Sequence, residues 1–298
     1  MGARVWTVKD ALDWTVAYFE REGVEAPRRS AEWLLSAATG LSRVEVYAYH
    51  ERPLADGERG LLREGVRRRA SGEPLQYVTG EMPFRHLILR VRPGVFIPRP
   101  ETEILVDVAL EALVGVEEPL VLEACTGSGC IACAIATERT DAQVVATEIS
   151  AQSAVVAREN VERFAVTERV SVHECDLFTN VPHDLRGKFD LVVSNPPYIP
   201  SRDLPDLPPE VHVHEPHLAL DGGHDGLDVV RRIASESLGW LKEGGVIAVE
   251  IDETCGGAAS KGLREWYQEV RVVRDLAGRD RIVTGQKPKV RQGQGSPR

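Results

Sequence analysis

The residues whose types and spacing most directly suggest chemistry are 195–198, which read Asn-Pro-Pro-Tyr. They follow the apolar run 189–193, which is interrupted only by an aspartate and predicts a buried strand. Neither proline can donate a backbone N–H to a sheet, so the strand has to end here. A residue before proline is driven into extended geometry, so Asn195 is held at the strand's carboxyl end. In an open α/β sheet, ligands bind at that edge.

A carboxamide at this edge suits a planar NH2 group as its partner. Asn195 Oδ1 and a proline carbonyl can each accept one N–H, and the ring of Tyr198 can stack on the plane. A proline-rich surface turn explains most Asn-Pro pairs, but the buried strand directly before this one favours a site for methylating an amide or exocyclic amine. We predict Asn195, Pro196 and Tyr198 as catalytic residues, and as substrate-binding residues Asn195, Pro196, Pro197 and Tyr198.

A second segment, residues 121–132, predicts a strand, a glycine-rich turn and the start of a helix. Gly127 and Gly129 allow positive φ angles and a close approach of the backbone to a ligand. Glu123 precedes the turn. Glu148 ends the next predicted strand, where a carboxylate can accept hydrogen bonds from ribose hydroxyls.

This loop alone does not separate two cofactors, because residues 127–132 also fit the dinucleotide pattern G-x-G-x-x-A. Three features favour S-adenosylmethionine (AdoMet) over NAD. Glu123 can hold the amino-acid end of AdoMet, whereas a second carboxylate does not help a pyrophosphate. The run 176–178, Asp-Leu-Phe, suits adenine. The Asn-Pro-Pro-Tyr loop has no role in hydride transfer.

Two clusters suggest chemistry that we do not predict. Cys130 and Cys133 form a C-x-x-C at a helix start, which we interpret as small residues packing the helix against the sheet rather than as a redox pair. Four histidines resemble a zinc site, but four prolines make their segment a loop, so we expect a solvated active-site loop and no metal. These histidines are His212, His214, His217 and His224.

Composition restricts the class of protein. The 298 residues carry a net charge of −10, which argues against a surface built to neutralise duplex nucleic acid. Five cysteines, an odd number, do not form a disulfide framework and predict a reduced, cytoplasmic protein. The sequence has no run of 18 apolar residues and no signal-peptide pattern, so we expect neither a membrane span nor secretion.

The elements that must position these residues fall into four segments. Residues 1–73 predict a small N-terminal helical domain, in which Arg67-Arg68-Arg69 is interpreted as a solvated helix face. Residues 74–97 predict a β-hairpin linker with strands at 75–78 and 84–91. Residues 98–285 alternate strands and helices, which predicts an α/β domain with a largely parallel, Rossmann-like sheet. The basic segment 286–298 is expected to be disordered.

We expect seven strands in this sheet. The first five along the chain are expected to be parallel, and the last two are expected to close the sheet as an antiparallel pair. The expected strand positions are 120–125, 143–149, 170–175, 189–194, 245–251, 270–276 and 280–285.

The chain resembles the PrmC/HemK-type protein-(glutamine-N5) methyltransferases, which modify peptide-chain release factors. The resemblance rests on ordered motifs that span about 74–228 and on the helical N-terminal segment. The motifs lie at 74–80, 96–103, 125–132, 176–178, 193–199, 215–216 and 219–228. Glu123 and Glu148 stand where the family usually has Asp, and Ala124 where a larger aliphatic residue is usual, which bears on ribose geometry rather than on cofactor identity.

The resemblance implies a class I AdoMet-dependent methyltransferase fold and methyl transfer to the glutamine of the Gly-Gly-Gln loop in class I release factors. We expect a monomer whose helical domain docks the protein substrate. An amine methyltransferase acting on DNA or RNA, and a non-catalytic AdoMet-binding protein, stay open as alternatives. Cofactor contacts are expected from Glu123, Cys125, Thr126, Gly127, Ser128, Gly129, Glu148, Asp176, Leu177 and Asn195.

Overall fold

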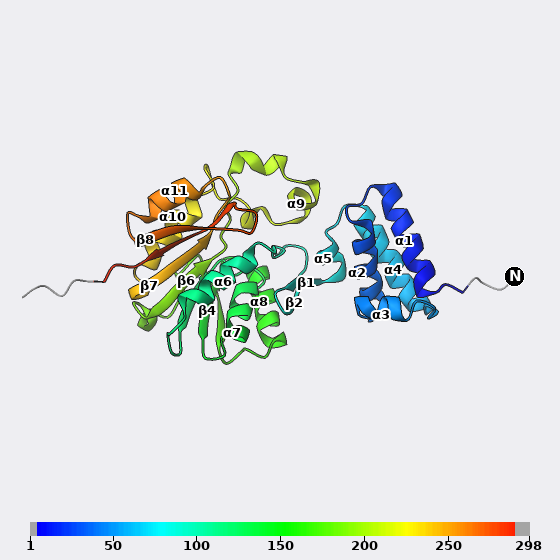
Figure 1. Ribbon diagram of the computed structural model, residues 1–298, viewed down its shortest axis with the longest axis horizontal. Coiled ribbons are helices and arrows are strands. Elements are labelled where there is room, and N and C mark those ends of the chain that lie inside the picture. Colours follow the sequence, from blue (N-terminus) through cyan, green and yellow to red (C-terminus); the bar gives the residue numbers. More distant parts are fainter. Residues whose placement is uncertain (1–4, 290–298) are drawn as a thin grey trace, which may run out of the picture. The chain divides into compact units, whose positions relative to one another are not determined.

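The computed structural model describes residues 5–289, and its contacts divide the chain into two units (Figure 1). The first unit is the N-terminal part up to Glu81 together with Pro208–His214. The second contains Met82–Leu207 and the chain from Glu215 onward. Among residues 5–289, no helix combines the length and apolar character that crossing a bilayer requires.

The first unit is helical, as the sequence predicts. A capping box between Thr7 and Asp10 starts its first helix, and Gly23 with φ +70° ends it. Phe19, Leu35 and other apolar side chains from these helices form one buried core. The helices are α1 Val8–Glu22, α2 Pro27–Thr39, α3 Arg43–Ala48, α4 Asp56–Ala70, α5 Leu75–Thr79 and the later α9 Pro209–His214.

The prediction of a strand at 75–78 is wrong, because this segment is the short helix α5. Pro74 starts it, since its carbonyl accepts from the N–H groups of Tyr77 and Val78. Gly80, with φ +77°, ends it one turn later. The hairpin therefore begins later than expected, as β1 Glu81–Phe84 and β2 Leu87–Arg90.

The basic run on α4 is not a uniformly solvated face. Arg67 is exposed and pairs with Glu64. Arg69, in contrast, is buried and donates to the Glu73 carbonyl at 2.9 Å and to Glu210 of α9 at 2.8 Å. The expectation failed because the partner of Arg69 lies 141 positions away in the sequence.

The second unit is built on a seven-stranded sheet in the order β5-β4-β3-β6-β7-β9-β8. The first five strands of this order are parallel, and β9 pairs antiparallel with both β7 and β8, which confirms the expected topology. The strands are β3 Leu120–Ala124, β4 Gln143–Glu148, β5 Val170–Glu174, β6 Phe189–Ser194, β7 Leu241–Glu250, β8 Gln268–Arg274 and β9 Asp280–Gln286.

Helices cover both faces of this sheet because alternate strand residues point to opposite sides. Val121 and Val193 belong to one buried cluster, whereas their neighbours Leu122 and Val192 belong to the other. The elements around the sheet are α6 Thr102–Ala112, α7 Cys130–Glu138, α8 Ala151–Arg163, α10 Asp228–Ser237 and α11 Gly256–Leu263, with 3-10 turns at His183–Leu185, Ser201–Asp206 and His217–Ala219.

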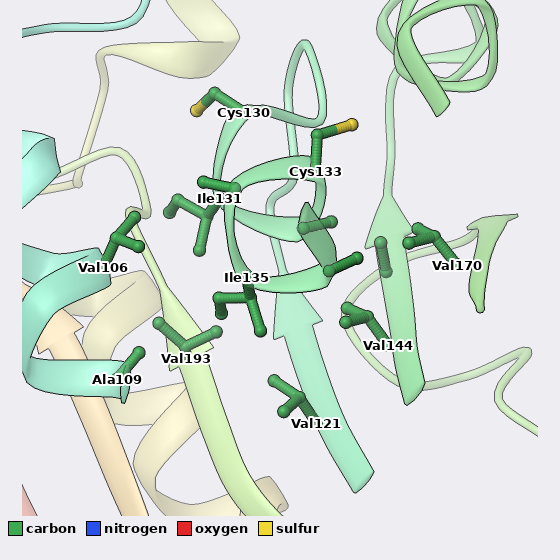
Figure 2. Packing of buried hydrophobic residues seen from close by; sticks show 14 of the residues in the cluster. Val106, Ala109, Val121, Cys130, Ile131, Cys133, Ile135, Val144, Val170 and Val193 are labelled. Carbon is green, nitrogen blue, oxygen red and sulfur yellow. The ribbon is translucent and has the colours of Figure 1, made fainter. Parts of the chain in front are cut away.

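Figure 2 shows the first cluster, in which Ile135 of α7 points toward Val121 and Val193 of the sheet, and Ile131 lies on the side of Val106 of α6. Cys130 and Cys133 lie on the same helix and are buried. Burial raises the pKa of both thiols well above the ordinary value, which agrees with a packing role and leaves no reactive thiolate pair.

The C-terminal segment remains ordered beyond the expected limit. Gln286 is the last residue of β9, and Lys287 Nζ donates to the carbonyls of Leu238 and Leu241, each at 2.7 Å. The prediction of disorder from 286 onward is therefore wrong for these residues, because Gln286 belongs to β9 and Lys287 bonds to carbonyls at the end of α10 and the start of β7. Residues 290–298, the rest of that expectation, lie outside the described residues.

Candidate active site

The sheet reverses its winding direction at β3 and β6, whose carboxyl ends lie side by side. The glycine-rich loop follows β3, and Asn195 follows β6. Ser194 Oγ donates to the Ala124 carbonyl at 2.7 Å and ties the two strand ends together. The fold thus brings both sequence-predicted segments to the place where an open α/β sheet binds ligands.

The loop after β3 is tightly turned. Cys125, Gly127 and Gly129 have φ angles of +59°, +57° and +81°. A Cβ at Gly127 would meet nothing within 4 Å, so this residue borders open space that a ligand can occupy. A Cβ at Gly129 would instead lie 3.3 Å from Ala157 Cα of α8. Gly129 therefore lets α7 start close to α8, and a side chain at this position would press on Ala157.

Glu148 lies at the end of β4, directly beside this loop. Its Oε2 accepts from the N–H of Gly127 at 2.8 Å, and its Oε1 accepts from the N–H of Ser150 at 2.9 Å. Burial raises the pKa of Glu148, and these two backbone bonds oppose that shift. Fixed in this way, the carboxylate keeps free lone pairs for ribose hydroxyls.

Ile149, the next residue, is half exposed although it is large and apolar, and it can cover the flat face of an adenine. Sequence reasoning missed it. The available signal was an isoleucine directly after the acidic residue that ends a buried strand.

Glu123 is fully buried below the glycine-rich loop. Its Oε2 accepts from Thr126 Oγ1 at 2.8 Å, so the carboxylate holds the loop from beneath. Its Oε1 has no hydrogen-bond partner among the described residues, and an ammonium group is the kind of donor that would satisfy it. Burial raises the pKa of Glu123 to about 8, despite the hydrogen bond from Thr126.

The three side chains of the run after β5, which are expected to contact adenine, lie in different surroundings. Asp176 Oδ2 accepts from Arg232 at 3.0 Å, and Leu177 is buried in the strained region with φ +45°. Phe178 packs in the core, with its ring 6.2 Å from that of Trp240. The aromatic side chain is therefore structural, and only Asp176 and Leu177 remain near the loop edge as candidates.

Asn195 is half buried and has a fixed carboxamide. Its Nδ2 donates to Thr102 Oγ1 at 3.0 Å, and Thr102 is completely buried at the start of α6. Because the nitrogen is engaged, Oδ1 is the atom available to accept a hydrogen bond from a substrate. Thr102 comes from a quoted motif, but its contact with Asn195 was not predicted.

Tyr198 is held from two sides. Its hydroxyl donates to Glu250 Oε1 at 3.3 Å, at the end of β7. A Cβ on Gly222 would lie 2.7 Å from Tyr198 Cα, and one on Gly226 would lie 2.3 Å from the Tyr198 carbonyl oxygen. The glycines of the 219–228 motif therefore let the backbone pack directly against the tyrosine.

The segment before α6 is anchored to the end of the loop that follows Tyr198. Arg99 forms an ion pair with buried Glu215, whose Oε2 also accepts from the N–H of Ile97 at 3.2 Å. The Arg99 guanidinium lies 4.9 Å from the centre of the Phe96 ring. Two motifs that the sequence places 116 positions apart thus form one support for the site.

The four histidines do not form a common site. His212 and His214 lie on α9, which belongs to the helical unit, whereas His217 and His224 belong to the second unit. Among the described residues, no group of three or more His, Cys, Asp or Glu side chains is arranged to hold a metal ion.

Comparison with known proteins agrees with this geometry. The family model of the PrmC N-terminal domain matches residues 10–80, and that of the methyltransferase small domain matches 87–205. The release factor glutamine methyltransferase of Geobacter sulfurreducens is 42% identical over 285 residues, which cover 94% of this chain and 97% of that protein. The corresponding protein of Rhodopirellula baltica is 38% identical, with 95% and 97% covered.

Among solved structures, the hMettl16 catalytic domain in complex with the MAT2A 3'UTR hairpin 6 has a TM-score of 0.54. It is 16% identical, with 79% of this chain and 84% of that chain covered, so the likeness concerns the fold alone. Identity over nearly the whole length of the curated relatives is a stronger criterion. By that criterion, the chain belongs to the family of release factor glutamine methyltransferases.

Proposed function

We propose that this protein transfers the methyl group of AdoMet to the side-chain amide nitrogen of the glutamine in the Gly-Gly-Gln loop of class I release factors. The observation that carries the proposal is the Asn195 carboxamide, whose nitrogen is bound to Thr102 at 3.0 Å so that Oδ1 is left as an acceptor. An acceptor with this fixed orientation recognises an NH2 group and not a carbonyl.

As a member of its family the protein is an AdoMet-dependent methyltransferase, and the described residues fit that cofactor. Open space beside Gly127 and the adjacent Glu148 carboxylate suit the cofactor's ribose. Glu123, through its unpartnered Oε1, is assigned to the amino-acid end. Further contacts are assigned to Cys125, Thr126, Ser128, Gly129, Asp176, Leu177 and Asn195.

The bound cofactor supplies an electrophilic methyl group on a sulfonium. An amide nitrogen is a weak nucleophile because its lone pair is delocalised into the carbonyl, so catalysis consists mainly of positioning. Asn195 Oδ1 and the Pro196 carbonyl accept the two N–H bonds and stabilise the positive charge that develops on nitrogen. Tyr198 packs the glutamine side chain. The cofactor, when bound, would supply its methyl group with loss of the positive charge on sulfur, and the methylated amide nitrogen would release its extra proton to water.

We propose that the helical unit docks the protein substrate. We expect a cytoplasmic protein, since release factors act on ribosomes, and we expect it to be a monomer. The net charge of −10 supports a protein substrate over duplex nucleic acid.

The test offers tritiated AdoMet with four acceptors: a release factor, the same factor with its Gly-Gly-Gln glutamine replaced, DNA and RNA. Label in the first acceptor alone is the expected result. Label in DNA or RNA would assign the site to amine methylation of nucleic acid. AdoMet binding without label in any acceptor would assign a non-catalytic role.

A further inference from the structure

We infer that helices α2 and α3 of the helical unit carry a docking surface for an acidic, partly apolar segment of the protein substrate. This surface is the arginine–aromatic patch, formed by Arg28, Trp33, Arg43, Val44 and Tyr47. The inference rests on the proposed function, because it names the surface with which the helical unit holds the release factor. It goes beyond the sequence expectation, which assigned docking to residues 1–73 as a whole.

The patch is organised by one buried carboxylate. Helix α3 packs against α2 (Figure 1), and Glu32 of α2 is only 5% exposed. Its Oε2 accepts from Arg43 Nε at 3.2 Å. Its Oε1 accepts from the Tyr47 hydroxyl and lies 3.4 Å from Arg28 Nε. Burial acts to raise the pKa of Glu32, but the hydrogen bonds from Tyr47 and Arg43 outweigh it and lower the pKa. The ionised carboxylate thus holds three side chains of the patch.

Both arginines of the patch are fixed a second time by an aromatic ring. Arg28 Nη2 donates to the Tyr47 hydroxyl at 3.0 Å, and its guanidinium lies 5.7 Å from the centre of that ring. The Arg43 guanidinium lies 5.7 Å from the centre of the Trp33 ring. A side chain that is already ordered loses less entropy when a partner binds. The two side chains remain 61% and 48% exposed, so a partner can reach their other N–H groups.

Apolar surface lies directly beside these cations. Val44 is 78% exposed and follows Arg43 on α3. Tyr47 is 45% exposed and lies three residues further along, on the same face of that helix. Tyrosine, tryptophan and arginine are the residues that most often carry the binding energy of protein interfaces. The composition of the patch is therefore that of a protein-binding surface.

The charge of the patch selects an acidic partner. Two guanidinium groups share the single carboxylate of Glu32, which leaves one excess positive charge. The other carboxylate of α3, Glu45, accepts from the N–H of Ser42 at 2.8 Å in a capping box. The whole chain carries a net charge of −10. An acidic segment is repelled by such a chain in general and attracted at this patch, so charge determines where it docks.

RNA is also an anion, but the patch fits it less well than it fits a protein. Nucleic-acid sites present a stripe of many basic residues that neutralise successive phosphates. Here the excess is one charge, and the exposed side chain of Val44 offers phosphate no hydrogen bond. The occupant assigned to the patch is therefore a segment of the release factor that carries carboxylates and apolar side chains, outside its Gly-Gly-Gln loop.

The principal test is the variant Val44→Glu, which places a carboxylate where the acidic segment would bind. Val44 is the second residue of α3, a position at which an acidic side chain suits the helix dipole, so the variant should fold. The Kd for the intact release factor is measured by calorimetry, with S-adenosylhomocysteine in place of AdoMet so that no transfer occurs. Val44→Glu should raise this Kd at least about tenfold, or 1.4 kcal/mol.

The control is Leu61→Glu, which introduces the same charge at an exposed apolar position on α4, a helix that contributes no side chain to the patch. Its Kd should stay within about twofold of wild type, a difference below 1.4 kcal/mol. A Kd for Val44→Glu that also stays within this range would overturn the inference.

A second pair of variants tests the cation without adding a charge. Arg28→Gln removes one guanidinium, while Glu32 keeps its bonds to Arg43 and Tyr47. It should raise the Kd for the release factor by about threefold to tenfold, the latter being 1.4 kcal/mol. Arg29→Gln removes the same charge from the next, exposed residue and should have a smaller effect. Equal effects of the two variants would contradict a specific role of Arg28.

Ionic strength tests the acidic character of the partner. The wild-type Kd should rise as salt is increased from about 0.05 M to about 0.3 M, because salt screens exposed charges. The Kd of Arg28→Gln should rise less over the same range, since one of the interacting charges is missing. A wild-type Kd that does not change with salt would contradict an acidic partner.

Steady-state methylation separates docking from catalysis. Val44→Glu should raise KM for the intact release factor and leave kcat close to wild type. A short Gly-Gly-Gln peptide lacks the docking segment, so kcat/KM for the peptide should be the same in both proteins. An equal loss with the peptide would show that the change acts on the catalytic site. RNA that displaces the release factor from wild type but not from Val44→Glu would assign the patch to nucleic acid.

The two readouts also distinguish this inference from the proposed function. A release factor that is bound with a Kd sensitive to Val44→Glu, but is not methylated, would refute the proposed function and leave the patch in place. A release factor that is methylated with the same Kd and KM by wild type and Val44→Glu would refute the patch alone. A release factor that wild type neither binds nor methylates would refute both.

Discussion

At the scale of single residues, the site depends on side chains whose hydrogen-bonding direction is fixed. In the proposed site Asn195 acts as an acceptor, because its nitrogen is already committed to Thr102. Glu148 is fixed by two backbone N–H groups, and Glu123 by the Thr126 hydroxyl. A substrate therefore meets a prepared arrangement and does not have to reorganise it, which is the main source of electrostatic catalysis.

Replacing Asn195 by alanine tests this arrangement directly. The Asn195→Ala variant should lose on the order of 100-fold in kcat, because one positioned hydrogen-bonding group is removed. Asn180→Ala, the same chemical change at an exposed position, should retain wild-type activity. Methylation of a release factor under saturating AdoMet measures both. Near-full turnover by Asn195→Ala would exclude the assigned role.

The raised pKa of Glu123 predicts that the free energy of unfolding depends on pH. Burial raises its pKa in the folded protein from 4.5 to about 8, so the folded state holds a proton that the unfolded state releases. The stability that this proton supports is complete below about pH 4.5 and is lost as pH rises through about 8.

Glu123→Gln has no carboxyl group at this position, so it does not lose this contribution to stability as the pH rises. Its melting temperature relative to wild type should therefore rise from pH 5 to pH 8, as measured by thermal unfolding. A difference between the two proteins that stays constant with pH would contradict the raised pKa of Glu123.

At the scale of elements, the loops that follow two neighbouring strands are assigned different functions, cofactor binding and substrate binding. We propose that the loop after β3 holds the cofactor and that the loop after β6 presents the acceptor for the substrate. The two glycines of the first loop have distinct roles. Gly127 borders open space, and Gly129 allows α7 to lie close to Ala157 of α8.

The variants Gly127→Ala and Gly129→Ala separate these roles. Both place a side chain at positive φ, which costs roughly 1–2 kcal/mol, so the backbone strain is shared. Gly127→Ala should weaken AdoMet binding at least about tenfold, a loss of 1.4 kcal/mol or more, with a smaller drop in melting temperature. Gly129→Ala should show the larger drop in melting temperature. Calorimetry and thermal unfolding measure both, and the reverse pattern would refute the assignment.

The sequence predicted these elements unevenly, for physical reasons. The parallel strands were placed correctly because buried strands are continuous apolar runs, and the position of Asn195 directly after its strand was predicted because two prolines mark the strand end. The contact of Glu250 with Tyr198 was missed because it follows from the register of β6 and β7, which no local pattern contains. The helix α5 was missed because five residues are too few for either periodicity to be distinguished.

At the scale of the whole molecule, the helical unit is assigned to substrate docking. A deletion of residues 1–72 should leave AdoMet binding near wild type and raise KM for the intact release factor, because a second contact surface raises the effective concentration of the reactive loop. A short Gly-Gly-Gln peptide, a poor substrate in either case, should be affected little.

The deletion also removes Arg69, the ion-pair partner of Glu210. Full-length Glu210→Gln is therefore the control, since it breaks that pair while keeping the helices. Its KM for the release factor should stay close to wild type. An equal loss for protein and peptide substrates, or loss of cofactor binding in a soluble fragment, would favour a stabilising cap over a docking domain.

The assignment of Pro208–His214 to the helical unit has a consequence for synthesis on the ribosome. Chain elongation delivers the N-terminal helices first, but Glu210 follows 141 residues after Arg69. Throughout that interval the nascent helices lack α9, which supplies the carboxylate partner of Arg69. The full set of contacts in this unit can therefore form only after residue 214 has been translated, when four strands of the sheet have already been made.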